Sequence, residues 1–229
     1  MRALNRSDLD EKSLVLLLKN PALPRPAVER ICREEMFFSS YQVQAAVVQN
    51  PRTPERIGLR YLPVLFWKDQ LLVARDFRIR MVLRRKADRA IIDRLRKMAL
   101  GEKLELARLA TTEILNALVI ERDARLLKAC LENPRATEET ALRLIRSTNV
   151  EPGFLVKLAQ MPRWFALYAV KLELSRAELT PVPLVLRILP TLKLEDLQLL
   201  ARDKRQPVVV TKQAREIIGL KLEESAREE

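Results

Sequence analysis

Two segments of the chain are copies of each other: residues 53–87 read TPERIGLRYLPVLFWKDQLLVARDFRIRMVLRRKA, and residues 180–214 read TPVPLVLRILPTLKLEDLQLLARDKRQPVVVTKQA. Fifteen of the thirty-five aligned positions are identical, and no gap is needed. Self-similarity at a fixed offset is typical of repeat proteins, whose units stack because none can bury its apolar face alone. The duplication therefore predicts an array of repeated helical units.

A third and weaker copy divides the interval between the first two. Residues 133–137 read NPRAT and echo NPRT at residues 50–53, so the three threonines lie 84 and 43 residues apart. A period near 42 follows, and two-helix HEAT and armadillo units run about 40–47 residues. Residues 20–24 mark another start, and a degenerate unit is expected near residues 95–108. We therefore expect helices throughout residues 95–122.

The string Asn-Pro-x-Thr-Pro ends one helix and starts the next. Proline disfavours a helical residue before it and has no N–H to donate, so the Asn-Pro pair closes a helix. Thr53 and Thr180 are then expected to cap the following helices, with Pro54 and Pro181 at the first helical position. The duplicated Leu72 and Leu199 are expected to be core leucines of their units.

These motifs resemble a known family. The stretch VQAAVVQNPRTP at residues 43–54, the spaced leucines after it and LVARD at residues 72–76 resemble the bacterial leucine-rich-repeat-variant and HEAT-like helical repeats. The resemblance covers roughly residues 14–220 and implies a right-handed α-α superhelix, with no chemistry attached. Some variant-repeat proteins hold an iron–sulfur centre on a cysteine cluster, whereas this chain has only Cys32 and Cys130. No cofactor is therefore expected.

Apolar spacing predicts an all-α chain, with an amphipathic helix of about twenty residues between Ile79 and Met98 as the clearest element. We expect one α-solenoid domain over residues 1–229 with about five two-helix units. Residues 1–40 would form an atypical N-terminal capping unit, and residues 221–229 a disordered acidic tail. The other expected helices are 8–19, 26–35, 40–49, 55–61, 111–121, 125–132, 138–146, 153–160, 164–174, 183–188, 194–201 and 208–223.

Composition argues against an enzyme. The chain has no histidine, four glycines and no metal-ligand spacing, so the usual acid–base group, phosphate loop and metal site are missing. We predict neither a small-molecule substrate nor a metal. Asp69 and Asp76 recur as Asp196 and Asp203, which favours a structural role because a catalytic group needed once has no reason to be duplicated. The apolar run at residues 14–18 is too short to span a membrane, and we expect a cytoplasmic protein.

Charge gives the clearest functional indication. The formal net charge is +12, and residues 75–97 hold ten basic and three acidic side chains. A stripe is expected along the predicted long helix, flanked by two further arginines. The stripe residues are Arg78, Arg85, Arg89 and Arg96, and the flanking residues are Arg80 and Arg84. Such a stripe attracts acidic protein surfaces or nucleic-acid phosphates, and the third interpretation is a solvated face with local pairs to its aspartates.

The two tryptophans complete the candidate site. Trp67 and Trp164 each neighbour a cation and could anchor a partner, although large aromatics at helical spacing also fill the gaps between helices. We therefore interpret the protein as a non-catalytic binding scaffold for an acidic protein partner. Sequence-independent binding of nucleic acid through the basic face is the alternative. A third hypothesis is a HEAT-like DNA glycosylase, and it rests on analogy of fold alone.

Overall fold

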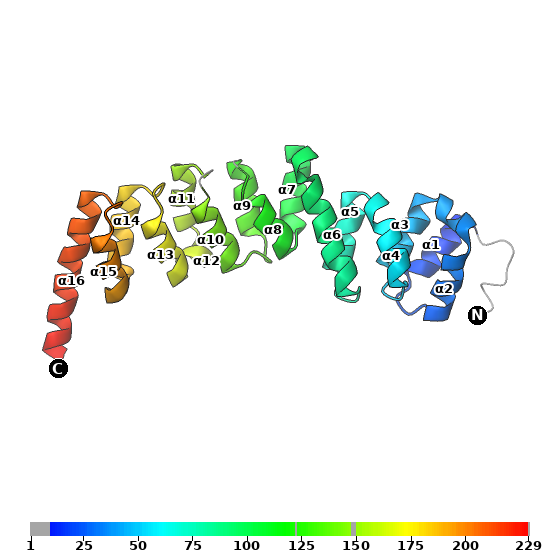
Figure 1. Cartoon of the computed structure of the whole chain (residues 1–229), viewed down its shortest axis with the longest axis horizontal. Coiled ribbons are helices and arrows are strands. Elements are labelled where there is room, and N and C mark those ends of the chain that lie inside the picture. The colour runs from blue at the N-terminus through cyan, green and yellow to red at the C-terminus, as the bar shows by residue number, and fades with distance from the viewer. Residues whose placement is uncertain (1–9, 122, 148–149, 229) are drawn as a thin grey trace. The chain divides into compact units, whose positions relative to one another are not determined.

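The computed structural model describes residues 10–121, 123–147 and 150–228 (Figure 1). Within these residues the chain forms α-helices, short 3-10 helices and turns, and no strand occurs there. Helices pack mostly on their neighbours in the sequence, as in a stacked helical array. The chain divides into two compact units, residues 1–99 and 100–229, and each unit is described by itself.

The first unit contains α1 to α6 with three 3-10 helices. The α-helices are α1 (Glu11–Lys19), α2 (Arg25–Arg33), α3 (Tyr41–Gln49), α4 (Glu55–Tyr61), α5 (Trp67–Arg75) and α6 (Met81–Arg94). The 3-10 helices are η2 (Glu35–Ser39), η3 (Leu62–Val64) and η4 (Leu95–Lys97). The twenty-residue helix expected from the sequence is therefore shorter, because its first turn is a loop and its last turn is 3-10 helix.

The second unit contains α7 to α16. They are α7 (Leu100–Leu109), α8 (Thr112–Leu118), α9 (Ala124–Glu132), α10 (Glu138–Arg146), α11 (Pro152–Ala159), α12 (Pro162–Phe165), α13 (Tyr168–Arg176), α14 (Val182–Ile188), η5 (Leu189–Thr191), α15 (Leu194–Arg202) and α16 (Val208–Glu228). Helices α7 and α8 occupy the segment where the repeat pattern is weakest, as expected. Residues 221–228, expected as a disordered tail, continue α16, and residue 229 lies outside the described residues.

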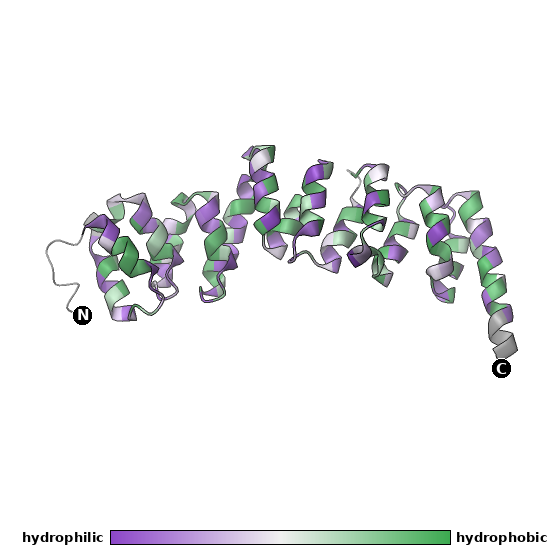
Figure 2. Cartoon of the chain, turned by 180° about the vertical axis from the view of Figure 1, so that it is seen from behind, coloured by the Kyte–Doolittle hydropathy of each residue, from purple (hydrophilic) through white to green (hydrophobic). Residues whose placement is uncertain are grey.

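Each helix carries an apolar side and a polar side, so the hydropathy alternates along the ribbons (Figure 2). In the first unit, apolar side chains from α3 to α6 form one cluster that includes Leu62, Leu65 and Leu83. A second cluster joins α1, α2 and α3 and includes Leu14 and Ile31. Burial of these stripes, rather than intrinsic helix propensity, stabilises helices as short as seven to nine residues.

The two sequence copies adopt the same local structure. Helices α3, α4 and α5 recur as α13, α14 and α15 with both ends shifted by 127 residues, and η3 recurs as η5. The duplicated Leu62 and Leu189 are both fully buried, at 0% exposure. Leu72 and Leu199, which we expected in the core, are 54% and 58% exposed, so that prediction was wrong. On α5 the buried residues lie at positions 70, 71, 73 and 74, and position 72 points to the opposite side.

One packing contact differs between the copies in a compensated way. Gly58 of α4 lies against Leu83 of α6, and a Cβ atom on this glycine would come within 2.8 Å of the leucine methyl groups. In the second copy the equivalent residues are Val185 and Val210, and both are buried. The first copy thus pairs no side chain with a large one, where the second pairs two of middle size. The smaller valine in place of the leucine leaves room for a side chain where the first copy needs glycine.

The asparagine of the Asn-Pro turn connects neighbouring helix pairs. The Asn50 amide nitrogen donates to the Leu18 carbonyl near the end of α1 at 2.7 Å, and its Oδ1 accepts from the Arg52 N–H at 2.9 Å. Asn133 repeats both contacts, to the Ala107 carbonyl of α7 at 2.7 Å and from Arg135 at 2.8 Å. Both asparagines are 3% exposed. Each asparagine side chain therefore satisfies a carbonyl near the end of another helix, α1 or α7, and fixes its own turn at the same time.

Thr53 and Thr180 of this motif do not cap the helices that follow them. The side chain of Thr53 is buried and donates to the Val47 carbonyl, so it closes α3. Pro54 and Pro181 occupy the N-cap positions of α4 and α14, and neither helix has a side-chain cap. The capping prediction was therefore wrong for Thr53 and Thr180. Threonine caps occur instead at Thr111, which accepts from the Ile114 N–H at the start of α8, and at Thr137, which forms a capping box with Thr140 at the start of α10.

Candidate binding site on the α6 face

Arg78, the first residue of the predicted stripe, lies in a turn and not on a helix. Arg78 precedes α6, and its guanidinium Nη2 lies 2.7 Å from Asp76 Oδ2, with a second bond from Nε to Oδ1 at 2.9 Å. The Arg78 backbone N–H also donates to Asp76 Oδ1 at 2.9 Å. The hydrogen bond between the side chains lowers the pKa of Asp76 and raises the pKa of Arg78. Arg78 is therefore part of a turn and does not align with the arginines of the helix.

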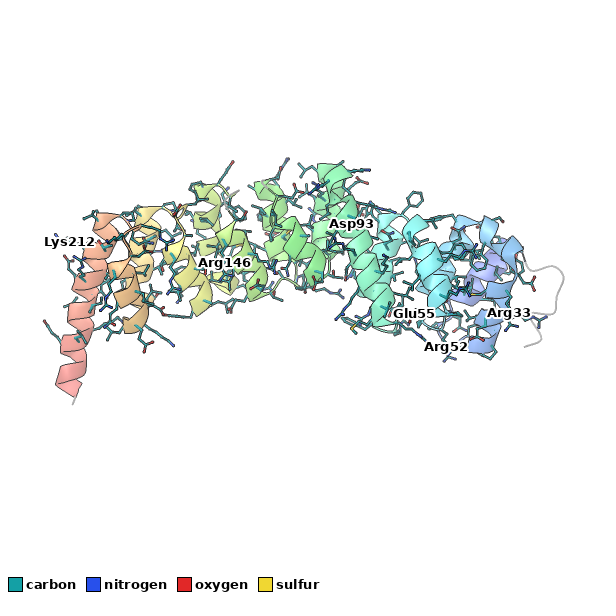
Figure 3. All side chains as sticks on the ribbon, in the orientation of Figure 1. Arg33, Arg52, Glu55, Asp93, Arg146 and Lys212 are labelled. Atoms are coloured by element: carbon teal, nitrogen blue, oxygen red, sulfur yellow. The ribbon has the colours of Figure 1, made fainter. Side chains whose placement is uncertain are left out.

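Two more predicted arginines have acidic partners. Arg80 lies 3.3 Å from Glu55 of α4, and Arg89 lies 3.2 Å from Asp93 one turn further along α6. Figure 3 labels both acids, with Glu55 on α4 and Asp93 towards the end of α6. These side chains are well exposed, and exposed pairs of this kind contribute at most about 1 kcal/mol each. They partly neutralise Arg80 and Arg89 without burying them.

Arg84 is turned towards an aromatic side chain. It is half-buried, with its guanidinium 5.0 Å from the centre of the Phe77 ring. Its Nε is buried and has no hydrogen-bond partner among the described residues. Phe77 itself is 76% exposed. Arg84 therefore lies beside the turn before α6, with its guanidinium against a ring that remains largely exposed to solvent.

The remaining predicted arginines, Arg85 and Arg96, lie on the open side of α6 and η4. Both are exposed, together with Lys86 and Lys97, and none of these four side chains has an ion pair or a hydrogen bond to another described residue. The opposite side buries Leu83, Ala87 and Ile91. We define the α6 face as the exposed residues of this open side. They are Met81, Val82, Arg85, Lys86, Arg89, Asp93, Arg96 and Lys97.

The α6 face also carries apolar surface. Met81 and Val82 at its start are 53% and 49% exposed. Val82 belongs to the apolar spacing that predicts this helix with Val82 on its buried side, and that prediction was wrong. The basic residue Arg94 points away from the face: its guanidinium donates to the carbonyls of Leu65 and Pro63 at 3.0 and 2.8 Å. Arg94 thereby holds the connection between α4 and α5 against α6.

Neither tryptophan is an exposed side chain. Trp164 is only 1% exposed, so it is a core residue of the second unit and not a surface anchor. The guanidinium of Arg163 lies 4.4 Å from its ring centre and donates to the carbonyls of Asn133 and Ala136. Trp67 begins α5 and is half-buried, with the Lys68 ammonium 5.4 Å from the ring centre. Cation–π contacts stabilise both rings where they are.

The duplicated aspartates have structural contacts in both copies. Asp69 accepts hydrogen bonds from the Tyr41 hydroxyl and from the Gln49 amide, the latter at 2.9 Å. Asp196 accepts from the Tyr168 hydroxyl and from Arg176 in the same two places. Burial and the bond to Asp69 raise the pKa of Tyr41 to about 12. These networks join α3 to α5 and α13 to α15, and their partners account for the duplicated acids without catalysis.

The turn of Asp76 and Arg78 recurs at Asp203, which accepts from Arg205, and a third time at Asp123, which caps α9. Its carboxylate accepts from the Arg125 guanidinium at 2.9 Å and from the N–H groups of Arg125 and Leu126. The bond from Arg125 is the largest contribution, and these contacts lower the pKa of Asp123 from 3.8 to about 2. A depressed folded-state pKa stabilises the fold above pH 3.8, and this contribution is lost as the pH falls towards about 2.

We therefore expect Asp123→Asn to lower the thermal midpoint at neutral pH. The midpoint of the variant should also decrease less than that of the wild type between pH 3.8 and about 2, the unfolded and folded pKa values of Asp123. Thermal unfolding followed by circular dichroism at several pH values measures both effects. Glu216→Gln, on the exposed side of α16, is the control and should keep the acid dependence of the wild type. Parallel curves for the wild type and Asp123→Asn would contradict this role.

Among the described residues no group of three or more Cys, Asp and Glu side chains lies close enough to hold a metal ion. Burial raises the pKa of the Cys130 thiol to about 12 and that of Cys32 to about 11, so both are protonated at neutral pH. No helix in the described part of the chain has the length and apolar content needed to cross a membrane.

Comparison with known proteins adds no family. No protein-family model, no curated protein and no solved structure matches this chain. The fold and the surfaces described above are therefore the basis for assigning a function.

Proposed function

We propose that the protein is a non-catalytic binding scaffold built from HEAT-like helix pairs, and that the α6 face holds an acidic protein partner. The observation that carries the proposal is the set of four exposed cations on one side of α6 and η4 that make no ion pair or hydrogen bond with another described residue. They are Arg85, Lys86, Arg96 and Lys97. Cations that pair within the fold contribute little field, whereas these four remain available to an acidic surface.

The repeated local structure supports the scaffold interpretation. Helices α3 to α5 and α13 to α15 have equal lengths at positions 127 residues apart. They also have equivalent buried leucines and an equivalent Tyr–Asp contact. Right-handed superhelices of two-helix units present extended surfaces and are used chiefly for binding. We infer that this chain belongs to that class of architecture.

The composition of the α6 face favours a protein over nucleic acid. Met81 and Val82 lie exposed beside the cations, and protein interfaces combine an apolar centre with charged surroundings. Binding to nucleic acid rests mainly on phosphate contacts, and stacking on single-stranded bases requires accessible aromatic rings. Trp164 is buried and cannot supply one, whereas the exposed ring of Phe77 before α6 could. The preference for a protein therefore rests on Met81 and Val82. Duplex DNA is therefore the alternative that an experiment must separate.

The decisive variant replaces Arg85, Lys86, Arg96 and Lys97 together by glutamine. We expect the circular dichroism spectrum and the thermal midpoint to stay close to those of the wild type, because all four side chains are exposed. Proteins captured from a nuclease-treated cell extract by the immobilised wild type should be lost or reduced at least tenfold with the variant, as mass spectrometry quantifies. The reason is that rim charges govern the rate of association and the discrimination between partners.

A matched control changes the net charge equally elsewhere on the first unit. It replaces Lys12, Arg33, Arg52 and Arg56 by glutamine, which are exposed and lie outside α6 and η4, and it should bind like the wild type. Equal losses in both variants would mean that only net charge matters. In a parallel titration with a DNA duplex, a linear fall of log affinity with log salt, with a slope of about 0.9 per phosphate, would favour nucleic acid.

A further inference from the structure

A cavity of about 420 Å³ lies between α9 and α11 in the second unit. Its main lining residues are Arg125, Lys128 and Glu132 from α9, Phe154 and Lys157 from α11, and Met161 from the turn after α11. The volume falls within the range of about 300–1,000 Å³ that is typical of ligand pockets. None of the arginines of the α6 face takes part, so this cavity is a separate candidate site.

The floor of the cavity is apolar and its rim is basic. Phe154 is 4% exposed overall, and Met161 is half-buried. On the rim, Lys157 is exposed and makes no hydrogen bond or ion pair with another described residue. Lys128 lies 3.6 Å from Glu132 in a well-exposed pair one helical turn apart. Such a pair is weak and leaves the ammonium available to a better acceptor.

Arg125 adds a third cation in a fixed orientation. Asp123 holds its Nε and Nη2 at 3.2 and 2.9 Å, so the guanidinium is oriented before any ligand arrives. The other terminal nitrogen, Nη1, has no partner among the described residues. With Asp123 included, three cations and two carboxylates surround the cavity, and Lys157 is the cation without an acidic partner among the described residues. The remaining positive charge favours acidic groups.

The length of the cavity defines the size of its occupant. The α9 lining residues run from position 124 to position 132, which corresponds to about 12 Å at 1.5 Å per residue. An extended chain covers about 3.3 Å per residue, so about four residues span the cavity. An apolar side chain in the middle of such a segment would reach Phe154 and Met161, and carboxylates on either side of it would reach the lysines.

We propose that the cavity between α9 and α11 binds a short extended acidic segment of a partner protein, in which one apolar side chain is flanked by carboxylates. The apolar floor distinguishes this ligand from a simple polyanion, and the basic rim distinguishes it from a neutral hydrophobic peptide. The site belongs to the second unit alone and does not depend on the α6 face.

Methionine methyl signals can test this proposal, because Met161 lies in the cavity and Met81 on the α6 face. The full-length protein is labelled with ¹³C on its methionine methyl groups, and Met161→Leu and Met81→Leu assign the two signals. The probe is a five-residue capped peptide with a central leucine and two glutamates on each side. We expect a saturable shift of the Met161 signal during the titration. Binding at the α6 face would instead move Met81, so the two sites are read separately.

Charge reversal at the rim gives the matched comparison. Lys128→Glu combined with Lys157→Glu should weaken peptide binding at least tenfold, because each new carboxylate repels the peptide. Lys204→Glu combined with Lys212→Glu makes the same charge change at exposed sites outside the cavity and should leave binding unchanged. The spectrum without peptide verifies that each variant is folded.

Two analogue peptides test the apolar and acidic requirements. One analogue has serine in place of the leucine, and the other has glutamine in place of the glutamates. We expect neither analogue to shift the Met161 signal. The proposal would be overturned by no Met161 shift up to millimolar peptide, by equal binding of the serine analogue, or by equal binding to the Lys128/Lys157 double variant. An equal Met161 shift with a single-stranded DNA oligonucleotide would also overturn it.

Discussion

Leu62→Ala and Leu189→Ala are each expected to lower the free energy of unfolding by about 2–5 kcal/mol, the range for fully buried leucines. Both side chains are 0% exposed and begin the 3-10 helix between the two helices of their copy. Alanine removes apolar atoms from the core and leaves a cavity that the short helices around it cannot fill completely. Urea unfolding followed by circular dichroism measures the loss.

Leu72→Ala and Leu199→Ala are the matched controls. They remove the same atoms from equivalent positions in the same two copies, but these leucines are 54% and 58% exposed. We expect losses below about 1 kcal/mol, since most of the side chain already contacts water. Equal losses at Leu62 and Leu72 would contradict the orientation of α5, and equal losses at Leu189 and Leu199 would contradict that of α15.

Asn133→Ala is expected to destabilise the second unit by about 2–4 kcal/mol, because a buried carbonyl loses its donor and the turn loses its acceptor. The amide nitrogen of Asn133 bonds to Ala107 at 2.7 Å and also lies 3.3 Å from the Ala110 carbonyl. Removal of the side chain leaves the buried end of α7 without these partners. Thermal and urea unfolding both report the change.

Asn20→Ala is the control for this contact. Asn20 is exposed, and its side chain makes the turn bond to the Ala22 N–H at 2.9 Å. Its replacement should cost less than about 1 kcal/mol, since water can satisfy an exposed group. A loss at Asn20 as large as the loss at Asn133 would show that the turn bond, rather than the bond to the preceding helix, carries the stability.

The positions of many helices could be predicted from local signals. The bounds of α4 and α10 match the predicted ranges, because proline turns and caps act within a few residues. The side that each helix buries was harder to predict. Leu72 recurs as Leu199, but the duplication shows only that the two positions are equivalent and does not indicate that they are buried. Helix α5 is short and largely apolar, so its periodicity does not define one buried side.

The candidate site was predicted in part. The basic character of α6 follows from the sequence, since it depends on charges within one segment. The pair between Arg80 and Glu55 joins residues 25 positions apart, and Arg78 is removed from the helix by the Asp76 turn. Neither contact can be read from spacing along one helix. The cavity between α9 and α11 was missed because its cations are spread over two helices and form no local cluster.

Lysine footprinting tests the central claim most directly. The protein is acetylated with and without the partner fraction that it captures, and mass spectrometry then quantifies modification at Lys86, Lys97 and Lys12, which are all exposed. If the α6 face binds the partner, Lys86 and Lys97 should become protected while Lys12, on α1, keeps its rate. Unchanged modification of Lys86 and Lys97 in the complex would contradict a binding role for the α6 face.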